Sequence, residues 1–289
     1  MTEHARLFEQ HRRLLFSVAY RMLGTLTDAE DAVQEAWLRW ERVSLDNVAT
    51  PQAYLVTVVT RLCIDQLRSA RMKREVYVGP WLPEPIVDTA LGADEHAALA
   101  DSLSMALLLM LERLNPVERA AFLLRDVFDY SYPELAAILE KSEDNCRQLV
   151  KRAKDRVKAG ETKYVPSLEE QDRLVAAFLG AIEQGDVDAL AAHLQEDATL
   201  YADGGGKVRS AMRPVHGALN IAKFLIGVTN KFRTSSHRNV LARVNGVLGV
   251  VVYDGDTADG VITADVEGGK VREIYIVRNP EKLVHVPEL

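Results

Sequence analysis

Apolar residues recur over roughly the first 160 positions at the three- and four-residue spacing of amphipathic helices. Such a stripe predicts a helix over residues 4–24, with Gly24 as its stop, and a second helix capped by Thr27. Thr50 and Pro51 open a third, long helix that is apolar in its first half and basic in its second. We therefore expect a helical module over residues 1–75.

The pattern breaks over residues 76–94, which carry three prolines and two glycines and read as a linker. Helical periodicity returns over residues 95–114. Asn115 and Pro116 then open another helix, which runs through Val127. A second helical module is expected over residues 95–163.

Residues 132–158 read as two helices joined by a tight turn, with Ser142 as the N-cap of the second. Cys146 begins an apolar stripe along that second helix, and polar and basic residues take its other faces. A short buried helix before a basic, amide-bearing one is typical of a helix-turn-helix, whose second helix enters the major groove of DNA. The alternative is an ordinary helical hairpin with a solvated basic face.

Beyond residue 167 the pattern changes to helices followed by alternating strands. Helices are predicted at 168–186, 187–195 and 219–232, and strands at 198–203, 237–245, 247–253, 260–267 and 270–278. Asn245-Gly246 and Gly268-Gly269 are hairpin turn signals. This order predicts an α+β domain over residues 167–289, with a curved antiparallel sheet.

The net charge and the distribution of cations bear on whether the chain binds nucleic acid. The chain has 35 Lys and Arg against 42 Asp and Glu, a net charge of −7, which argues against a protein that coats nucleic acid indiscriminately. Cations nevertheless cluster in two segments, 61–74 and 147–158, and two separate contacts with DNA would explain that clustering.

The compartment follows from what the chain lacks. No apolar run approaches the roughly 20 residues of a membrane span, and the N-terminal residues carry charges where a signal peptide needs an apolar core. Cys63 and Cys146 are expected to be buried structural thiols without metal-ligand spacing. A cytoplasmic protein without a bound metal or cofactor is predicted.

Two side-chain groupings in the first module allow more than one interpretation. Asp28, Asp31 and Glu35 share a helix face, which is either a solvated surface or a docking site for a basic partner. On the long helix, Asp65 is expected to orient the neighbouring Arg61 and Arg68 through pairs one turn apart. The aromatic rings of Trp37 and Tyr54 are expected to pack in the core rather than stack on bases.

Three segments, TDAEDAVQEAWLRWER from Thr27, TPQAYLVTVVTRLCIDQLRSARMKR from Thr50 and LNPVERAAFLLRDVFDYSYPELAAILEKSEDNCRQLVKRAKDRV from Leu114, carry a family resemblance. They resemble the second and fourth conserved regions of sigma-70-family initiation factors, most closely the small extracytoplasmic-function type. The resemblance implies that the first module binds the β′ clamp helices of core RNA polymerase and melts the promoter near minus ten. It implies that the second module reads the minus-35 element.

The resemblance also assigns residues to these roles. Core-polymerase binding falls to Asp28, Asp31, Gln34 and Glu35. Minus-ten contacts fall to Asp46, Asn47 and Thr50 in a loop, and to Arg61, Arg68, Arg71, Lys73 and Arg74 on the long helix. Minus-35 contacts fall to Asn145, Arg147, Gln148, Lys151, Arg152 and Lys154. These are side-chain types that reach phosphates and base edges.

Residues 167–289 resemble a SnoaL-like domain of the nuclear transport factor 2-like superfamily, a cone around a pocket. DGGGK (203–207), NPEKL (279–283) and WLPEP (81–85) resemble motifs of the sigma-factor subgroup that carries this extension. The regulatory contacts expected from them are Trp81, Asp203, Gly204, Gly205, Gly206, Lys207, Asn279 and Pro280. The glycine-rich loop could fold back onto the first module or clamp a ligand.

Enzymes of that superfamily use a pocket Asp or His, so Asp203, His216, His237 and Asp265 were considered as proton-transfer groups. We expect no catalysis, since a shared fold is only an analogy. The predicted function is that of an alternative sigma factor, modulated in cis by residues 167–289 packing against the first two modules. A small molecule or protein is a possible ligand of that domain. The alternatives are a one-component ligand-responsive regulator and an isomerase fused to a DNA-binding module.

Overall fold

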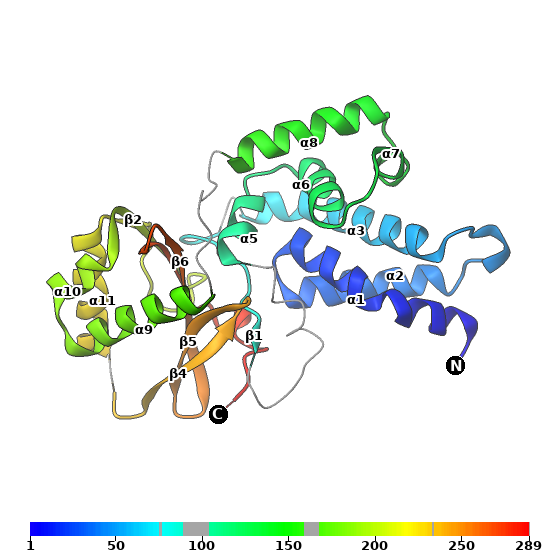
Figure 1. Cartoon of the computed structure of the whole chain (residues 1–289). Coiled ribbons are helices and arrows are strands. Elements are labelled where there is room, and N and C mark those ends of the chain that lie inside the picture. The colour runs from blue at the N-terminus through cyan, green and yellow to red at the C-terminus, as the bar shows by residue number, and fades with distance from the viewer. Residues whose placement is uncertain (75–76, 89–103, 159–167, 233, 289) are drawn as a thin grey trace. The chain divides into compact units, whose positions relative to one another are not determined.

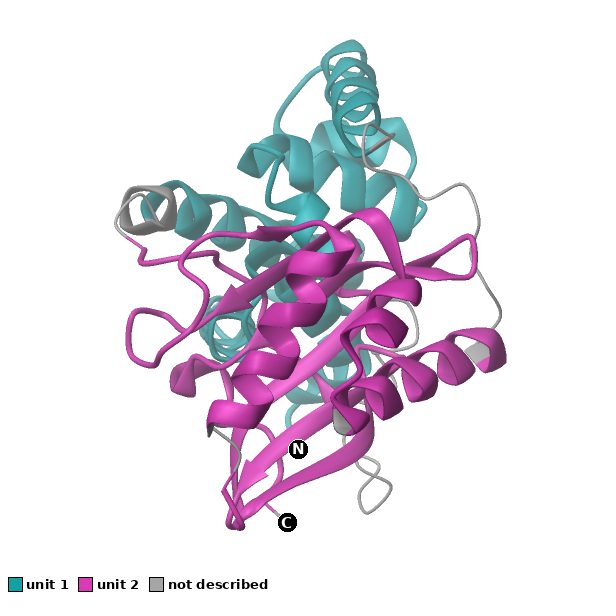
Figure 2. Ribbon diagram, turned by 90° about the vertical axis from the view of Figure 1, so that its left-hand side faces the viewer, with its two compact units in different colours: residues 1–76, 108–161 teal, residues 77–107, 162–289 magenta. Residues whose placement is uncertain are grey.

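The computed structural model describes residues 1–74, 77–88, 104–158, 168–232 and 234–288. Of residues 70–74, 88, 158, 168, 183 and 232 it describes the backbone alone. The chain divides into two compact units (Figure 2). Unit 1 comprises Met1–Val76 and Leu108–Glu161, and unit 2 comprises Tyr77–Leu107 and Thr162–Leu289.

The first part of unit 1 contains α1 (Glu3–Leu23), α2 (Leu26–Trp40), the short 3-10 helix η1 (Leu45–Asn47) and α3 (Pro51–Arg74) (Figure 1). Gly24 ends α1 in the left-handed conformation, as predicted. The predicted cap of the second helix was wrong. Thr25, not Thr27, is the N-cap of α2, and its hydroxyl accepts the Asp28 N–H at 3.4 Å.

The second part of unit 1 contains α5 (Met105–Leu111), α6 (Pro116–Phe122), the π-helical turn η2 (Leu123–Val127), α7 (Tyr132–Leu139) and α8 (Glu143–Lys158). Asn115 caps α6 in a reciprocal pair with Glu118, and Ser142 receives the Asn145 N–H at 3.3 Å at the start of α8. The predicted Asn-Pro and Ser142 starts are therefore confirmed. Residues 95–103 of the predicted 95–114 helix lie outside the described residues.

The two parts of unit 1 are joined by buried side chains. Arg119 of α6 donates to the Met22 carbonyl at the end of α1 and to Glu112, both at 2.6 Å. Its burial lowers the pKa of Arg119 to about 9, which still leaves it charged at neutral pH. Both cysteines, Cys63 and Cys146, are buried free thiols, as expected.

Unit 2 is built on a seven-stranded sheet of order β1-β4-β5-β6-β7-β2-β3. Its strands are β1 (Val87–Asp88), β2 (Leu194–Asp203), β3 (Val215–His216), β4 (His237–Val244), β5 (Val247–Asp254), β6 (Thr257–Glu267) and β7 (Lys270–Val277). All neighbours are antiparallel except β2 and β7. The expected antiparallel meander is thus confirmed for β4–β7. Its three hairpin turns contain Asn245-Gly246, Gly255 and Gly268-Gly269, all with positive φ.

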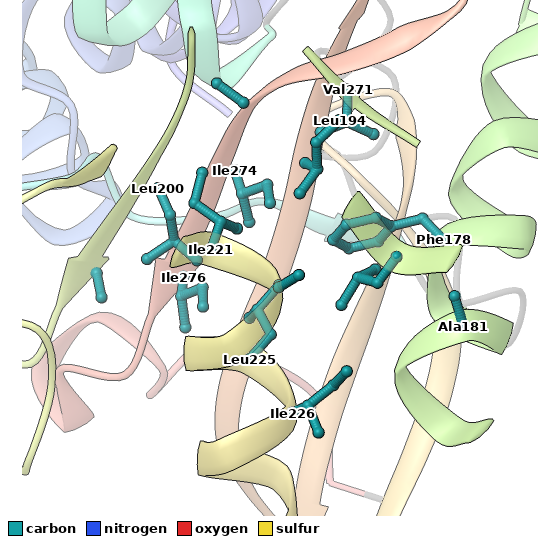
Figure 3. Close-up of a cluster of buried hydrophobic side chains, with 14 of the residues drawn as sticks. Phe178, Ala181, Leu194, Leu200, Ile221, Leu225, Ile226, Val271, Ile274 and Ile276 are labelled. Atoms are coloured by element: carbon teal, nitrogen blue, oxygen red, sulfur yellow. The ribbon is translucent and has the colours of Figure 1, made fainter. Parts of the chain in front are cut away.

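Helices α9 (Leu168–Gln184), α10 (Val187–Ala192) and α11 (Ala218–Phe232) cover part of this sheet. The core of unit 2 lies between them and strands β2 and β7 (Figure 3). Phe178 of α9 and Ile221 and Leu225 of α11 meet Leu200 and Ile274 there. A short 3-10 helix, η3 (Pro280–Lys282), follows β7.

The first part of the predicted linker belongs to the sheet of unit 2. We call residues 77–88 the docked segment. It ends in β1, where Val87 pairs with Val244 and Asp88 with Arg243 of β4. Ile86 exchanges hydrogen bonds with Asn245, through the Asn245 N–H at 2.8 Å and the Asn245 side-chain oxygen at 3.2 Å. No helix among the described residues is long and apolar enough to cross a membrane.

Candidate functional site

The acidic face of α2 has one carboxylate turned inward and the others outward. Asp28 is half-buried, and its oxygens accept from the Gln66 amide of α3 at 2.7 Å and from the Thr25 hydroxyl at 2.5 Å. Asp31 and Gln34 are exposed, and Glu35 pairs with Arg39 one turn away at 2.9 Å. Asp31 and Gln34 are thus the most accessible of the four predicted docking side chains.

The loop before α3 presents its three predicted residues to solvent. Asp46 and Asn47 lie in η1, Thr50 immediately precedes α3, and all three are exposed. A short turn with open polar side chains is suited to capturing unstacked bases.

Arg61 has a different environment from the one predicted. Its guanidinium donates to the carbonyls of Ile138 and Ala137 at 3.1 and 3.4 Å and pairs with Glu140 at 3.0 Å. The prediction that Asp65 orients Arg61 was therefore wrong, because the unpaired carbonyls at the end of α7 are a stronger attraction for a cation. Arg68 does contact Asp65, at 3.4 Å.

The remaining predicted minus-ten cations lie near the end of α3. Arg71, Lys73 and Arg74 belong to the last turns of this helix, but their side chains lie outside the described residues.

The predicted helix-turn-helix is formed by α7 and α8. Ser131 caps α7 in a reciprocal pair with Glu134, and Glu140 ends it with a left-handed φ of 52°. Leu135 and Ile138 of α7 are buried, as are Cys146, Leu149 and Val150 of α8. The buried stripe predicted from sequence is therefore the one that holds the two helices together.

On the outer faces of α8 the six predicted minus-35 residues divide into two groups. Asn145, Gln148 and Lys151 are exposed, and Arg147 stacks 4.6 Å from the Tyr132 ring centre while pairing with Glu143. Arg152 and Lys154 instead reach toward α6 and η2, at 3.5 Å from Glu118 and 2.6 Å from Asp126. The first group is more accessible to a DNA groove.

In unit 2, Asp203 gathers the three predicted motifs around one buried carboxylate. One oxygen accepts from the Tyr77 hydroxyl at 2.6 Å and the Gly205 N–H at 3.0 Å. The other accepts from the Leu82 N–H at 2.9 Å and the Lys282 ammonium at 2.7 Å. We call Tyr77, Trp81, Asp203, Asn279 and Lys282 the Asp203 cluster.

Lys282 links this carboxylate to the docked segment. Its ammonium donates to the Leu82 carbonyl and lies 4.2 Å from the centre of the Trp81 ring. Asn279 donates its amide to the Tyr77 oxygen at 2.9 Å. Burial, reinforced by Asp203, raises the pKa of Tyr77, so its proton stays in the hydrogen bond at neutral pH.

The glycine-rich loop is shaped by close approach. Gly205 and Gly206 have positive φ, and a Cβ on Gly205 would lie 2.5 Å from the Asn279 amide. A Cβ on Gly206 would lie 3.0 Å from Val78 of the docked segment. Lys207, next in the loop, pairs with Glu281. Within unit 2 these contacts hold the loop against Asn279 and the docked segment.

The groups considered for proton transfer do not come together. Asp203 is fully buried within its cluster, and the exposed His216 contacts Thr199 at 3.1 Å. Burial, with Glu273 nearby, raises the pKa of Asp265 to about 6. Only His237 of the four lines the cavity between α9, α11 and strands β4–β7.

Several important residues were missed by sequence reasoning. Tyr77 lies near a recognised motif and Lys282 lies within one, but only the folded chain reveals that both contact Asp203. Glu118, 2% exposed, was not singled out, yet it completes the cap of α6 and also pairs with Arg152 and Arg156. A further pair, Glu84 with His285 at 2.6 Å, joins the docked segment to the C-terminal residues.

Known proteins resemble this chain over its whole length. The Sigma-70 region 2 family matches residues 7–72, and the Sigma-70 region 4 family matches residues 104–157. The ECF RNA polymerase sigma factor SigJ of Mycobacterium tuberculosis is 40% identical over 97% of this chain and 93% of its own. The probable ECF RNA polymerase sigma factor SigI of the same species is 30% identical over 94% of this chain and 92% of its own.

A solved structure agrees with these sequence matches. The crystal structure of the Mycobacterium tuberculosis extracytoplasmic function sigma factor SigJ superposes with a TM-score of 0.79 at 36% identity, covering 95% of this chain and 96% of that one. The agreement includes the α+β unit as well as the helical one. This chain therefore belongs to the extracytoplasmic-function sigma factors of the sigma-70 family.

Proposed function

We propose that this protein is an alternative sigma factor that directs core RNA polymerase to specific promoters, and whose α+β domain regulates it in cis. The observation that carries the proposal is the exposed basic and amide face of α8, which packs on α7 through a buried stripe, in a chain of this family. It is not an enzyme, and its partners are the polymerase and promoter DNA.

Polymerase binding is assigned to α2. Asp31 and Gln34 offer an exposed acidic and polar surface to the basic partner, the β′ clamp helices, and Glu35 extends it. Asp28 supports this surface from within, because its hydrogen bond to Gln66 fixes α2 against α3. Since core polymerase is intracellular, we assign the protein to the cytoplasm.

Promoter contacts are assigned to two modules, residues 1–75 and 95–163. Asp46, Asn47 and Thr50 capture minus-ten bases, and the cations of α3 hold the backbone. Asn145, Arg147, Gln148 and Lys151 read minus-35, with Arg152 and Lys154 released from their carboxylates for phosphate contacts.

The state described here is a resting state. The two promoter elements lie about 25 base pairs apart, which is about 85 Å at 3.4 Å per step. In unit 1, however, Arg61 of α3 is bonded to α7 at 3.1 Å. Modules in direct contact do not read both elements at once, so engagement requires Arg61 to leave α7.

The α+β domain, residues 167–289, is proposed to act through the docked segment. The linker of about 19 residues spans at most about 65 Å when extended. The Asp203 cluster anchors residues 77–88 to the α+β domain, which removes most of the length over which the linker can extend. The domain thus limits how far the two modules separate.

In vitro transcription with purified core polymerase tests the function. The full chain should support initiation from a cognate promoter, and Asp31→Lys should lower polymerase binding at least tenfold. Glu9→Lys, which changes the charge equally on exposed α1, is the control. Tight promoter-duplex binding without polymerase, together with failure to initiate with it, would favour a one-component regulator instead.

A further inference from the structure

Unit 2 contains a cavity of about 680 Å³ outside the Asp203 cluster, within the size range of small-molecule sites. Its floor is the face of strands β4–β7, and α9 and α11 form its walls. All the residues that line it belong to the described part of unit 2.

The strand register divides the cavity into an apolar end and a polar end. Leu241, Val250, Ile262 and Ile276 are cross-strand neighbours in one apolar row. The next row on this face begins two residues earlier on β4, with Asn239. Two residues earlier again, His237 lies opposite Asp254. The lining therefore changes from aliphatic to polar along the strands, as it would around an amphipathic molecule.

At the polar end of the cavity, Arg278 and Asp259 form an ion pair. Arg278 donates to both Asp259 carboxylate oxygens at 2.8 and 2.7 Å, to the Asp259 carbonyl at 3.4 Å and to the Arg209 carbonyl at 3.0 Å. A guanidinium has five N–H donors, so it retains one. With Asp254 beside this pair, the end carries two carboxylates and one guanidinium, which disfavours an anionic head group.

His237 provides a donor there. Its Nδ1 accepts from the Thr234 N–H at 3.1 Å and lies 2.6 Å from the Thr234 hydroxyl. In the neutral ring the proton therefore lies on Nε2, 3.8 Å from an Asp259 oxygen. That distance is too long for a direct hydrogen bond, so Nε2–H can donate to a ligand oxygen, and Asn239 adds an amide beside it.

At the apolar end, Leu241 lines the cavity with 58% of its surface exposed. An apolar side chain open to solvent inside a concave lining is what an empty ligand site leaves.

We propose that this cavity binds an uncharged amphipathic small molecule, whose aliphatic part lies along Leu241, Val250 and Ile262 and whose hydroxyl or carbonyl oxygen accepts from His237. An anion meets excess carboxylate charge. A cation must compete with Arg278 for the Asp259 carboxylate and offers no acceptor for Nε2–H. The proposal concerns binding by the α+β domain and does not depend on the role in transcription.

The test uses the full chain and displacement of the neutral fluorescent probe N-phenyl-1-naphthylamine. Decanol, decanoate and decylammonium share one tail and differ in head charge. Decanol should displace the probe at least tenfold more tightly than either ion. Asp259→Asn removes the carboxylate that occupies Arg278, so decanoate should bind that variant at least tenfold more tightly than the parent.

Leu241→Trp should abolish probe binding by filling the apolar end. Arg238→Trp, on the opposite face of the same strand, is the matched control and should bind as the parent does. Circular dichroism establishes that each variant is folded. Absence of probe binding to the parent, equal or tighter binding of an ion, or an unchanged decanoate affinity in Asp259→Asn would each overturn the proposal.

Discussion

The Asp203 carboxylate lies at the centre of a buried hydrogen-bond network in unit 2. The folded chain surrounds it with four donors and excludes it from solvent. Its work is to hold the docked segment.

Asp203→Asn is expected to destabilise unit 2 by about 3–5 kcal/mol, because it leaves the Lys282 ammonium buried without its carboxylate. Urea unfolding measures the loss, and hydrogen exchange at the Leu82 amide reports it locally. Lys207→Ala is the comparison. It removes an exposed pair with Glu281 and should cost less than about 1 kcal/mol. Equal costs for the two variants would contradict the assigned role.

Asp265 makes stability depend on pH. Its folded pKa, raised to about 6 by burial, lies above the usual value, so the folded chain binds this proton more tightly than the unfolded chain does. Stability from this group is therefore present below about pH 4 and lost as pH rises through 6. Asp265→Asn should stabilise the protein by about 3 kcal/mol at pH 8 and have little effect at pH 4, measured by urea unfolding. The same gain at both pH values would show that the effect is not ionic.

Residues whose role is local were predicted well. Gly24, Asn115 and Ser142 act at helix ends as their chemistry requires. Tyr77 and Lys282 escaped notice because their partner is more than 70 residues away in sequence. Short-range patterns carry no information about such pairs.

At the scale of elements, long periodic segments were predicted and short ones were missed. The helix-turn-helix and the β4–β7 meander have enough residues for their periods to show. β1 has two residues and β3 has two, and each exists only because a neighbouring strand offers free backbone groups. The β-strand propensities of Val87 and Asp88 do not predict that pairing.

Arg61→Leu is expected to loosen the end of α7, because the Ala137 and Ile138 carbonyls lose their donor. Amide exchange at Glu140 and Lys141 should quicken about fivefold, corresponding to about 1 kcal/mol for a partly exposed cation. Arg68→Leu, whose partner Asp65 lies on the same helix, should leave these amides unchanged. Equal rates in both variants would remove Arg61 from the contact that holds the resting state.

Variants on the outer face of α8 should distinguish phosphate contacts from base contacts by the salt dependence and the sequence preference of promoter binding. Lys151→Ala should weaken polymerase-dependent promoter binding across sequences and lower the salt slope by about 0.9. Gln148→Ala should change the preference among minus-35 sequences with the slope unchanged. Filter binding at several salt concentrations measures both. An unaltered slope in Lys151→Ala would remove that residue from the phosphate contacts.

At the scale of the molecule, the order of the modules and the fold of each were predictable, because each is a long segment with its own pattern. Membership of the docked segment in unit 2 was not. Prolines and glycines in 76–94 indicate an absence of regular helix and say nothing about what the segment binds. Only the apolar Trp81 and Leu82 suggest from sequence that the segment docks somewhere.

Releasing the docked segment should raise transcription if the α+β domain restrains the modules. Gly205→Ala places a methyl group 2.5 Å from the Asn279 amide and should raise promoter-specific initiation at least threefold. Gly185→Ala is the matched control, since it has the same positive φ and open space around it. Initiation unchanged in Gly205→Ala, with Leu82 exchange increased, would separate docking from regulation.

The Asp203 cluster can form in a nascent chain only after Lys282 has been synthesised. Lys282 emerges from the ribosome 200 residues after Leu82, whose carbonyl it will bind. At about 5–20 residues per second, this separation corresponds to about 10–40 s of synthesis. Throughout that interval the polymerase-binding helix α2 has already left the ribosome. Lys282, which anchors the docked segment, has not yet been made. Each molecule is therefore unrestrained at first and acquires its restraint only after Lys282 has been made.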